Sequence, residues 1–355
     1  MAGISRRSFL EAGGVSAAVA FMVANGVKLK ANPLGLPIGS QTYPHRARIA
    51  SGEFPALLKD MKSIGIDVIE LCDPWNYKEF AALQDAKTTR KMLDDAGIKA
   101  ISCHVGMGIL RKQHQTVLDW AKVVGLTQLS TADLGGTTRD GKSRLAGGVT
   151  TPFWIKEAAD EYNAIAAVTK KAGLLTVLHN EGFCNSRTAD GRLTYPLLIE
   201  ALDPALVGMQ FQMSSMTTMG NPINYFTVYP GRFWSAHMQG VDASQGVRGA
   251  APQTLPDKNA PQGRRGGAPP AAAPAAGAAA AGAPAAGAPA AGGAAMGGGA
   301  PGGGGRGGLS VGEDSVNWEA VFTAAKVGGM KNFFIEQAWD LSVKSAAFLK
   351  TLTVA

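Results

Sequence analysis

Histidine and carboxylate side chains in this 355-residue chain stand where short apolar segments end. Four of the five histidines follow such segments, and two glutamates do the same. These residues are His45, His104, His179, His237, Glu70 and Glu336. Imidazole and carboxylate groups are ligands of divalent transition metal ions, and they are also the usual general acids and bases. The pattern therefore predicts a metal site or a proton-transfer site.

Some of these residues also have a purely structural interpretation. Glu70 could be a core carboxylate in a salt bridge, and His104 could be a hydrogen-bonded core histidine. His237 and Glu336 follow apolar segments and have no evident local partner. Because a desolvated glutamate without a partner is costly, a metal ion or a substrate is favoured as their partner. The three cysteines lack the spacing of a metal site.

The segments around these residues alternate as they do in a parallel α/β fold. Short apolar runs predict strands at 38–43, 67–72, 99–104, 126–131, 174–180, 206–212, 232–239 and 332–337. Longer amphipathic stretches predict helices at 54–64, 78–96, 115–124, 152–172, 195–202, 221–229 and 316–326. Eight strand-then-helix units predict a closed (β/α)8 TIM barrel. The open dinucleotide-binding alternative would need a G-x-G-x-x-G turn after the first strand, and none follows it.

The barrel is expected over residues 35–350, and its active site should lie at the carboxyl ends of the strands. The polar residues predicted at these ends are Gln41, Glu70, His104, His179, Gln212, His237 and Glu336, with Glu181, Trp75 and Trp339 just beyond them.

Two segments differ in composition from the barrel. Residues 1–31 contain Arg6 and Arg7 before Phe9 and Leu10, then a weakly apolar stretch, which predicts a twin-arginine export signal and a periplasmic or cell-envelope location. In 243–308, alanine, glycine and proline make up 51 of 66 residues, which predicts a disordered insertion between the seventh strand and the seventh helix. Without the first 30 residues and this insertion, 259 residues remain, close to the size of one barrel.

Charge and hydropathy exclude several classes of protein. The net charge of +7 resides in the leader, with +3, and in the insertion, with +4, so the barrel holds 25 basic and 25 acidic residues. A neutral barrel argues against a nucleic-acid partner. No run of about 20 apolar residues follows the leader, which excludes a polytopic membrane protein, and the leader itself is too short and Gly/Ala-rich for a stable span. Three cysteines exclude a disulfide-stapled miniprotein.

Short motifs in a fixed order give the chain a resemblance to a known family. They are IGSQTY at 38–43, IDVIEL at 66–71, AGIK at 96–99, ISCH at 101–104, LHN at 178–180, DPALVG at 203–208, YPGRF at 229–233, GEDSVNW at 312–318 and FIEQ at 334–337. Together they resemble the sugar phosphate isomerase/epimerase family of xylose isomerase-like TIM barrels, in its exported twin-arginine branch. The resemblance covers about residues 35–242 and 309–350.

The resemblance implies a divalent metal ion at the mouth of the barrel. Manganese is expected first, with zinc, iron or magnesium as alternatives. The implied ligands are His179, Gln212, His237 and Glu336. Gln212 stands where the family has aspartate, and His179 where it has a carboxylate. Glutamine is a neutral donor that binds a divalent cation less tightly than aspartate, so loss of the metal stays an alternative.

The implied activity is isomerisation or epimerisation of an unphosphorylated sugar or sugar derivative through a metal-stabilised ene-diolate. Glu336 and Glu181 would be the catalytic acid and base. The implied substrate-binding residues are Gln41, Glu70 and His104, with Trp75 and Trp339 as stacking walls. A lyase or hydrolase acting on a keto-sugar or glycoside, and a sugar-binding barrel without catalysis, remain alternatives. The expected partners are a carbohydrate and the twin-arginine export machinery.

Overall fold

The structure is a computed structural model that describes residues 32–132, 134, 149–180, 183, 186–242 and 308–354. The predicted leader and residues 243–307 of the predicted insertion lie outside the described residues, and so does Glu181. Export, insertion and the role of Glu181 therefore stay predictions. Among the described residues, no helix is both long enough and apolar enough to cross a membrane.

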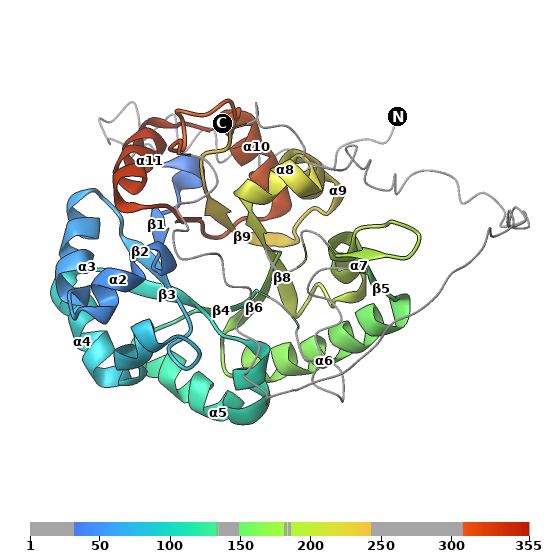
Figure 1. Cartoon of the computed structure of the whole chain (residues 1–355), viewed down its shortest axis with the longest axis horizontal. Helices are drawn as coiled ribbons and strands as arrows, with labels where there is room; N and C mark the ends of the chain where they lie inside the picture. Colours follow the sequence, from blue (N-terminus) through green and yellow to red (C-terminus); the bar gives the residue numbers. More distant parts are fainter. Residues whose placement is uncertain are drawn as a thin grey trace, which may run out of the picture. The chain divides into compact units, whose positions relative to one another are not determined.

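Eight parallel strands close into a barrel, which confirms the predicted (β/α)8 TIM barrel (Figure 1). Around the ring the order is β1, β10, β9, β8, β6, β4, β3 and β2, which then returns to β1. The strands are β1 (Gly39–Gln41), β2 (Val68–Leu71), β3 (Lys99–His104), β4 (Gln128–Thr131), β6 (Leu175–His179), β8 (Val207–Gln212), β9 (Phe233–Met238) and β10 (Phe334–Ile335). All eight lie within the segments predicted from the sequence.

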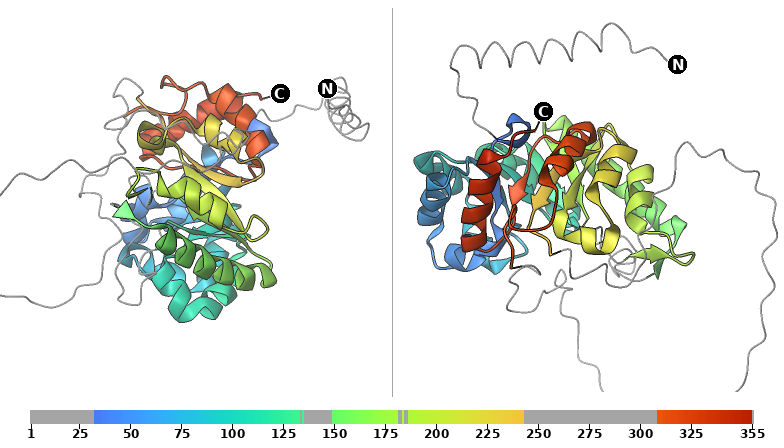
Figure 2. Two further views of the ribbon diagram at one scale, coloured as in Figure 1. Left: turned by 90° about the vertical axis from the view of Figure 1, so that its right-hand side faces the viewer. Right: turned by 90° about the horizontal axis from the view of Figure 1, so that it is seen from above.

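Helices surround the ring of strands, as Figures 1 and 2 show. They are α2 (Arg46–Ala50), α3 (Phe54–Ser63), α4 (Ala86–Ala96), α5 (Met107–Val124), α6 (Pro152–Lys171), α7 (Thr194–Ala201), α8 (Met216–Met219), α9 (Pro222–Val228), α10 (Trp318–Gly328) and α11 (Trp339–Thr351). Short 3-10 helices are η1 (Pro33–Gly35), η2 (Tyr43–His45), η3 (Lys78–Gln84) and η5 (Met213–Ser215).

Several predicted elements need correction. The predicted helix at 78–96 is two elements, η3 and α4, because Asp85 caps α4 by accepting hydrogen bonds from the backbone nitrogens of Lys87 and Thr88. Helix α5 begins at Met107, well before the predicted residue 115. The helices α2, α8 and α11 were not predicted, nor was a separate small sheet of β5 (Val149–Thr150) and β7 (Arg187–Thr188).

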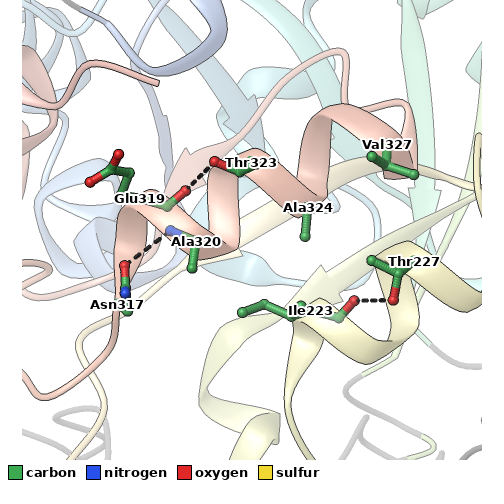
Figure 3. Close-up of a pocket in the computed structure, with 8 residues that line it drawn as sticks. All are labelled: Ile223, Thr227, Asn317, Glu319, Ala320, Thr323, Ala324 and Val327. Carbon is green, nitrogen blue, oxygen red and sulfur yellow. Dashed lines mark hydrogen bonds between the residues drawn. The ribbon is translucent and has the colours of Figure 1, made fainter. Parts of the chain in front are cut away.

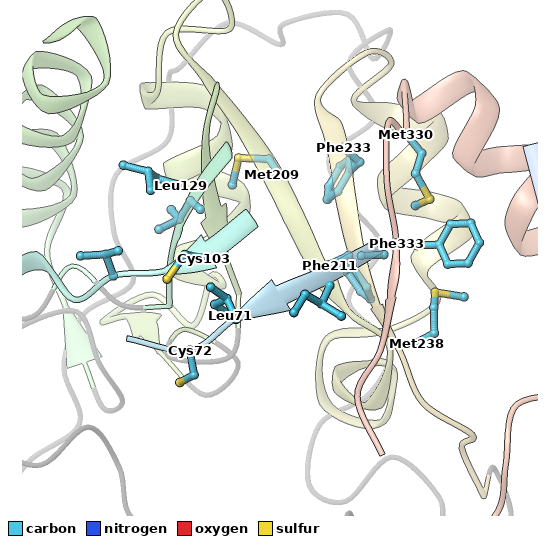
Figure 4. Close-up of a cluster of buried hydrophobic side chains, with 14 of the residues drawn as sticks. Leu71, Cys72, Cys103, Leu129, Met209, Phe211, Phe233, Met238, Met330 and Phe333 are labelled. Carbon is cyan, nitrogen blue, oxygen red and sulfur yellow. The ribbon is translucent and has the colours of Figure 1, made fainter. Parts of the chain in front are cut away.

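The apolar core lies between the strands and the surrounding helices. Phe211 of β8 packs against Tyr225 and Phe226 of α9 and against Phe233 of β9, with ring centroids 5.4–6.1 Å apart. Figure 4 shows Phe211 and Phe233 of this core, together with Cys103, which is a buried free cysteine. Burial of these large rings fixes α9 against β8 and β9, the strands that carry much of the site.

The segments of the chain just before residue 243 and just after residue 307 lie against each other. The backbone nitrogen of Val241 donates to Asp314 Oδ2 at 2.9 Å, and Gln337 Nε2 donates to the Leu309 carbonyl at 2.9 Å. Gly240 lies so close that an added Cβ would be 2.2 Å from the Leu309 oxygen. The chain therefore leaves the barrel after β9 and returns beside its point of departure.

Candidate active site

Carboxyl ends of several strands bring the predicted polar residues into one cluster. Glu70 lies near the end of β2, His104 ends β3, His179 ends β6 and His237 lies near the end of β9. Gln212 ends β8, where it is paired in register with His237. Because all eight strands are parallel, these ends meet at the same mouth of the barrel.

Three imidazoles lie against one another in this cluster. The ring centroids of His104 and His179 are 5.1 Å apart, those of His104 and His237 are 5.2 Å apart, and those of His179 and His237 are 4.4 Å apart. One nitrogen from each ring lies within 4.8 Å of the other two. Imidazole nitrogen is a frequent ligand of zinc and iron, so the cluster is a possible three-histidine metal site.

Glu70 lies against two of the imidazoles and is fully buried. Its Oε1 is 2.5 Å from His237 Nε2 and 3.1 Å from His104 Nε2. Its Oε2 accepts hydrogen bonds from Ser102 Oγ at 2.7 Å and from Gln210 Nε2 at 2.9 Å. Both carboxylate oxygens thus contact protein groups, so the geometry resembles the core ion pair that was the structural alternative for Glu70.

Ion pairing dominates the electrostatics of the cluster. Burial is the largest effect on the Glu70 carboxyl and would raise its pKa, but attraction and hydrogen bonds from His104 and His237 together outweigh it and hold that pKa well below its usual value. Burial likewise acts to lower the pKa of His237, whereas Glu336 and Glu70 raise it to about 10. Without an ion in the cluster, the two carboxylates therefore favour the protonated form of His237.

Glu336 follows β10 directly and reaches the other side of His237. Its Oε2 accepts hydrogen bonds from Gln212 Nε2 at 2.8 Å and from Gln239 Nε2 at 3.1 Å, and it lies 3.3 Å from His237 Nδ1. Gln212 Oε1 is 3.0 Å from the same Nδ1. The structure thus brings Gln212, His237 and Glu336 together, as the sequence predicts, and it adds Gln239.

Gln210 is a member of the cluster that lies on a predicted strand but has no role among the predicted site residues. Its Nε2 donates to Glu70 Oε2 and to Ser235 Oγ, each at 2.9 Å. Its Oε1 accepts from Ser130 Oγ at 2.7 Å and lies 3.0 Å from His104 Nε2. The available signal was spacing, because Gln210 stands two residues before Gln212 and alternate residues of a strand share a face.

Solvent reaches only part of the cluster. The side chains of His104 and Glu336 are each 12% exposed, whereas those of Glu70 and His237 are fully buried. Of these four titratable groups, His104 and Glu336 are therefore the ones that a substrate at the mouth can touch.

The remaining predicted residues lie beside the cluster or outside the described part of the chain. Gln41 is paired in register with Glu70, and its Oε1 accepts a short hydrogen bond from the backbone nitrogen of Tyr43. Trp75 packs edge to face against Trp120 of α5, at a centroid distance of 5.2 Å. Trp339 begins α11 and contacts the ring of His45 at 6.0 Å. Both tryptophans thus contact other rings, and their predicted role as sugar-stacking walls stays a prediction.

The donor set of the cluster fits a divalent transition metal ion. One nitrogen from each of the three imidazoles lies within 4.8 Å of the other two, and the carboxylates of Glu70 and Glu336 contact His237 from two sides. Nitrogen-rich sets of this kind suit zinc and iron better than manganese, magnesium or calcium, which prefer oxygen ligands.

A second concave surface lies between α9 and α10 (Figure 3). It is lined by Ile223, Thr227, Asn317, Glu319, Ala320, Thr323, Ala324 and Val327. Glu319 is its only ionisable side chain, and no imidazole lines it. The groove therefore differs from the barrel mouth, where imidazoles and carboxylates lie together.

Comparison with solved structures agrees with the barrel. A sugar phosphate isomerase/epimerase from Parabacteroides distasonis ATCC 8503 is 16% identical with a TM-score of 0.55, over 89% of this chain and 94% of that one. An IOLI protein with a bound zinc atom is 10% identical with a TM-score of 0.53, over 88% and 96%. An L-ribulose 3-epimerase is 13% identical with a TM-score of 0.50, over 89% and 91%. No family model and no curated protein matches the chain in sequence. The likeness is one of fold.

Proposed function

We propose that this protein is a sugar isomerase or epimerase that moves a proton at the carbon next to a carbonyl group of an unphosphorylated sugar or sugar derivative. The observation that carries the proposal is the pair of partly exposed groups, Glu336 and His104, which flank the buried His237 at the mouth of the barrel. A carboxylate placed in this way can remove a proton and return it, while His104 lies where it can contact the substrate or an ion. Similar barrels that include a sugar phosphate isomerase/epimerase and an L-ribulose 3-epimerase support the class.

Glu336 is the group assigned to proton removal. Hydrogen bonds from Gln212 and Gln239 go to Oε2, the oxygen that also faces His237. Among the described contacts of this carboxylate, none goes to Oε1, so Oε1 is the atom that takes the substrate proton. The Nδ1–H group of His237 and the two amides keep the carboxylate oriented between turnovers.

His104 is the second partly exposed group of the cluster. Its ring stacks on His237, with an interplanar angle of 18°, and its Nε2 is held by Glu70 and Gln210. A divalent ion bound in the cluster would stabilise the negative charge that builds on the substrate oxygens during deprotonation. Glu181 stays a further candidate for the second carboxylate predicted from the sequence.

The substrate class follows from charge. Within the described part of the chain, no lysine or arginine forms a hydrogen bond or ion pair with Glu70, His104, His237 or Glu336. A phosphate group is usually bound by arginine, lysine or a helix N-terminus, so this cluster favours an uncharged sugar. We also propose that the twin-arginine leader directs the protein to the periplasm, where free sugars are the available substrates.

Isotope exchange tests the proposed function. The full chain is incubated with zinc or manganese and a panel of free aldoses and ketoses in D2O, and deuterium at the carbon next to the carbonyl is followed by NMR. We expect exchange together with a new epimer or isomer, and a loss of at least about 100-fold in Glu336→Gln. Glu319→Gln, in the groove between α9 and α10, should keep the wild-type rate. Elimination without exchange, or saturable sugar binding with no reaction, would contradict the proposal.

A further inference from the structure

We propose that the ion-binding site of this protein consists of Glu70, His104, His179 and His237, and that Gln212 and Glu336 orient His237 from outside the site. This inference deepens the proposed function, which needs an ion at the mouth but does not specify its ligands. The set implied by the family resemblance consists of His179, Gln212, His237 and Glu336. The two sets share His179 and His237. The set proposed here has Glu70 and His104 in place of Gln212 and Glu336.

Glu70 Oε1 is the point on which the donors converge. It lies 2.5 Å from His237 Nε2 and 3.1 Å from His104 Nε2, and the His179 ring is 4.4 Å from that of His237. Donor atoms around a zinc ion at about 2.0–2.1 Å lie roughly 3.3 Å apart in a tetrahedral arrangement. The two separations from Glu70 Oε1 are shorter than this, and the three imidazole nitrogens lie within 4.8 Å of one another, so the carboxylate and the rings would have to shift to admit an ion.

The two nitrogens of His237 have different partners. Gln212 Nε2 donates to Glu336 Oε2, so the amide must turn its carbonyl oxygen towards His237 Nδ1. A carbonyl oxygen only accepts, and Nδ1 therefore carries a proton. Nε2, which faces Glu70 and His104, is then the nitrogen whose proton an ion would replace. A ligating histidine that donates its other N–H to a carboxylate or carbonyl is the usual arrangement in metal sites.

The two carboxylate oxygens of Glu70 also have different partners, one facing the imidazoles (the inner oxygen) and one facing other protein groups (the outer oxygen). Its Oε2 accepts from Ser102 and Gln210, while Oε1 faces the imidazoles. Gln210 is itself fixed, because it donates to Ser235 and accepts from Ser130. The outer oxygen is thus oriented by buried groups, and the inner oxygen is the one available to an ion.

Charge and accessibility agree with this assignment. Three neutral imidazoles and one carboxylate form a set that suits zinc, cobalt or iron. Glu336 lies on the far side of His237 and is 12% exposed, so it keeps the access to substrate that its proposed role requires. If Glu336 were a ligand instead, its charge would be shared with the ion and it would be a weaker base.

Zinc affinity tests the assignment without reference to catalysis. The full chain is stripped with EDTA, and its zinc affinity is measured by competition with a chromophoric chelator. Glu70→Gln and Glu336→Gln form a matched pair, because both carboxylates contact His237 and the substitution is the same. We expect Glu70→Gln to lose far more affinity than the roughly 10–100-fold that an outer partner costs, and Glu336→Gln to stay within that range.

A second pair keeps the test valid if Glu70→Gln does not fold. His104→Gln removes a proposed ligand, so its zinc affinity should fall by far more than about 100-fold. Gln212→Leu removes only an outer partner, so its zinc affinity should stay within about 100-fold of the wild-type value. Circular dichroism and the unfolding midpoint establish that each variant is folded. Wild-type affinity in folded His104→Gln, with binding abolished in Glu336→Gln, would overturn the assignment in favour of the sequence-derived set. A wild-type chain that binds no zinc or cobalt would overturn both sets, while deuterium exchange would still decide the proposed function.

Discussion

Glu70 on β2 and His237 on β9 meet inside the barrel although β1 and β10 separate their strands, with Oε1 and Nε2 2.5 Å apart. Both side chains are fully buried. A charged group removed from water costs several kcal/mol unless a partner compensates it, so each of the two makes the burial of the other possible.

A double-mutant cycle measures this coupling. We expect Glu70→Gln and His237→Leu each to lower the free energy of unfolding by about 3–5 kcal/mol, because each leaves a buried charge with one partner fewer. The double variant should lose at least about 1 kcal/mol less than the sum of the two. Urea unfolding at pH 7, followed by tryptophan fluorescence, gives all four values. Strict additivity would show that the two groups act independently.

The side-chain amide of Gln210 makes four contacts beside this pair. Its partners are Glu70, His104, Ser130 and Ser235. Gln210→Leu should lower the free energy of unfolding by about 2–4 kcal/mol, because it leaves Glu70, Ser130 and Ser235 with lost partners in a buried place. Gln115→Leu is the matched control, since Gln115 is exposed on α5 and bonds only to Asp119 among the described residues. The control should change stability by less than about 0.5 kcal/mol. Equal effects in the two variants would remove any special role for Gln210.

The positions of the histidines could be predicted from the sequence, because the strand pattern and one rule of barrel geometry determine them. His104 and His179 end apolar runs, and parallel strands of a closed barrel bring all such ends to one mouth. Their closeness follows from topology alone. The (β/α)8 fold was predictable for a related reason, because eight strand-then-helix units are the number that closes into a barrel.

The contacts of Gln210 and Trp339 could not be predicted in this way. Gln210 bonds to Glu70 across the barrel interior, between strands that are not neighbours, and such distances depend on strand tilt and stagger rather than on sequence spacing. Trp339 begins a helix that was not predicted, and the direction of its side chain towards His45 depends on that helix. A strand end fixes where a residue lies, but the following loop fixes where its side chain points.

Gly240 provides a test of the junction that flanks residues 243–307. A Cβ added there would lie 2.2 Å from the Leu309 carbonyl oxygen and 2.6 Å from that of Ser310, and backbone cannot easily move aside. Gly240→Ala should therefore lower the free energy of unfolding by about 2 kcal/mol or more. Gly308→Ala is the matched control, because no atom lies within 4 Å of its added Cβ. Thermal unfolding of both variants checks the difference, and an unchanged midpoint in Gly240→Ala would contradict the close approach.

The same junction predicts tolerance of a deletion. The backbone nitrogen of Val241 donates to Asp314, and the side chain of Gln337 donates to the Leu309 carbonyl. Contacts outside 243–307 therefore hold the two sides of the junction together. Replacing residues 243–307 by a short glycine linker should leave the unfolding midpoint within a few degrees of the full chain, because loop-closure entropy changes slowly with length. A deleted chain that fails to fold would show that these residues contribute to the barrel itself.

His45 predicts an acid-sensitive component of stability. The residue is 4% exposed, its Nε2 has no hydrogen-bond partner among the described residues, and its ring contacts Trp339. Burial, with a smaller contribution from Arg48, lowers its pKa from 6.5 to about 4. A histidine that must stay neutral in the folded state binds its proton more tightly when unfolded. Its contribution to stability is therefore complete above pH 6.5 and is lost as the pH falls towards 4.

The comparison between pH 7 and pH 5 isolates this contribution. Over that interval the wild type should lose about 2 kcal/mol more free energy of unfolding than His45→Gln, which has no imidazole to protonate. Carboxylates titrate in both proteins and cancel in the difference. His114→Gln serves as a comparison, because His114 is only half-buried and bonds to Thr169 Oγ1, so its removal should change the pH dependence less. If wild type and His45→Gln lose the same stability on acidification, His45 is not held neutral by the fold.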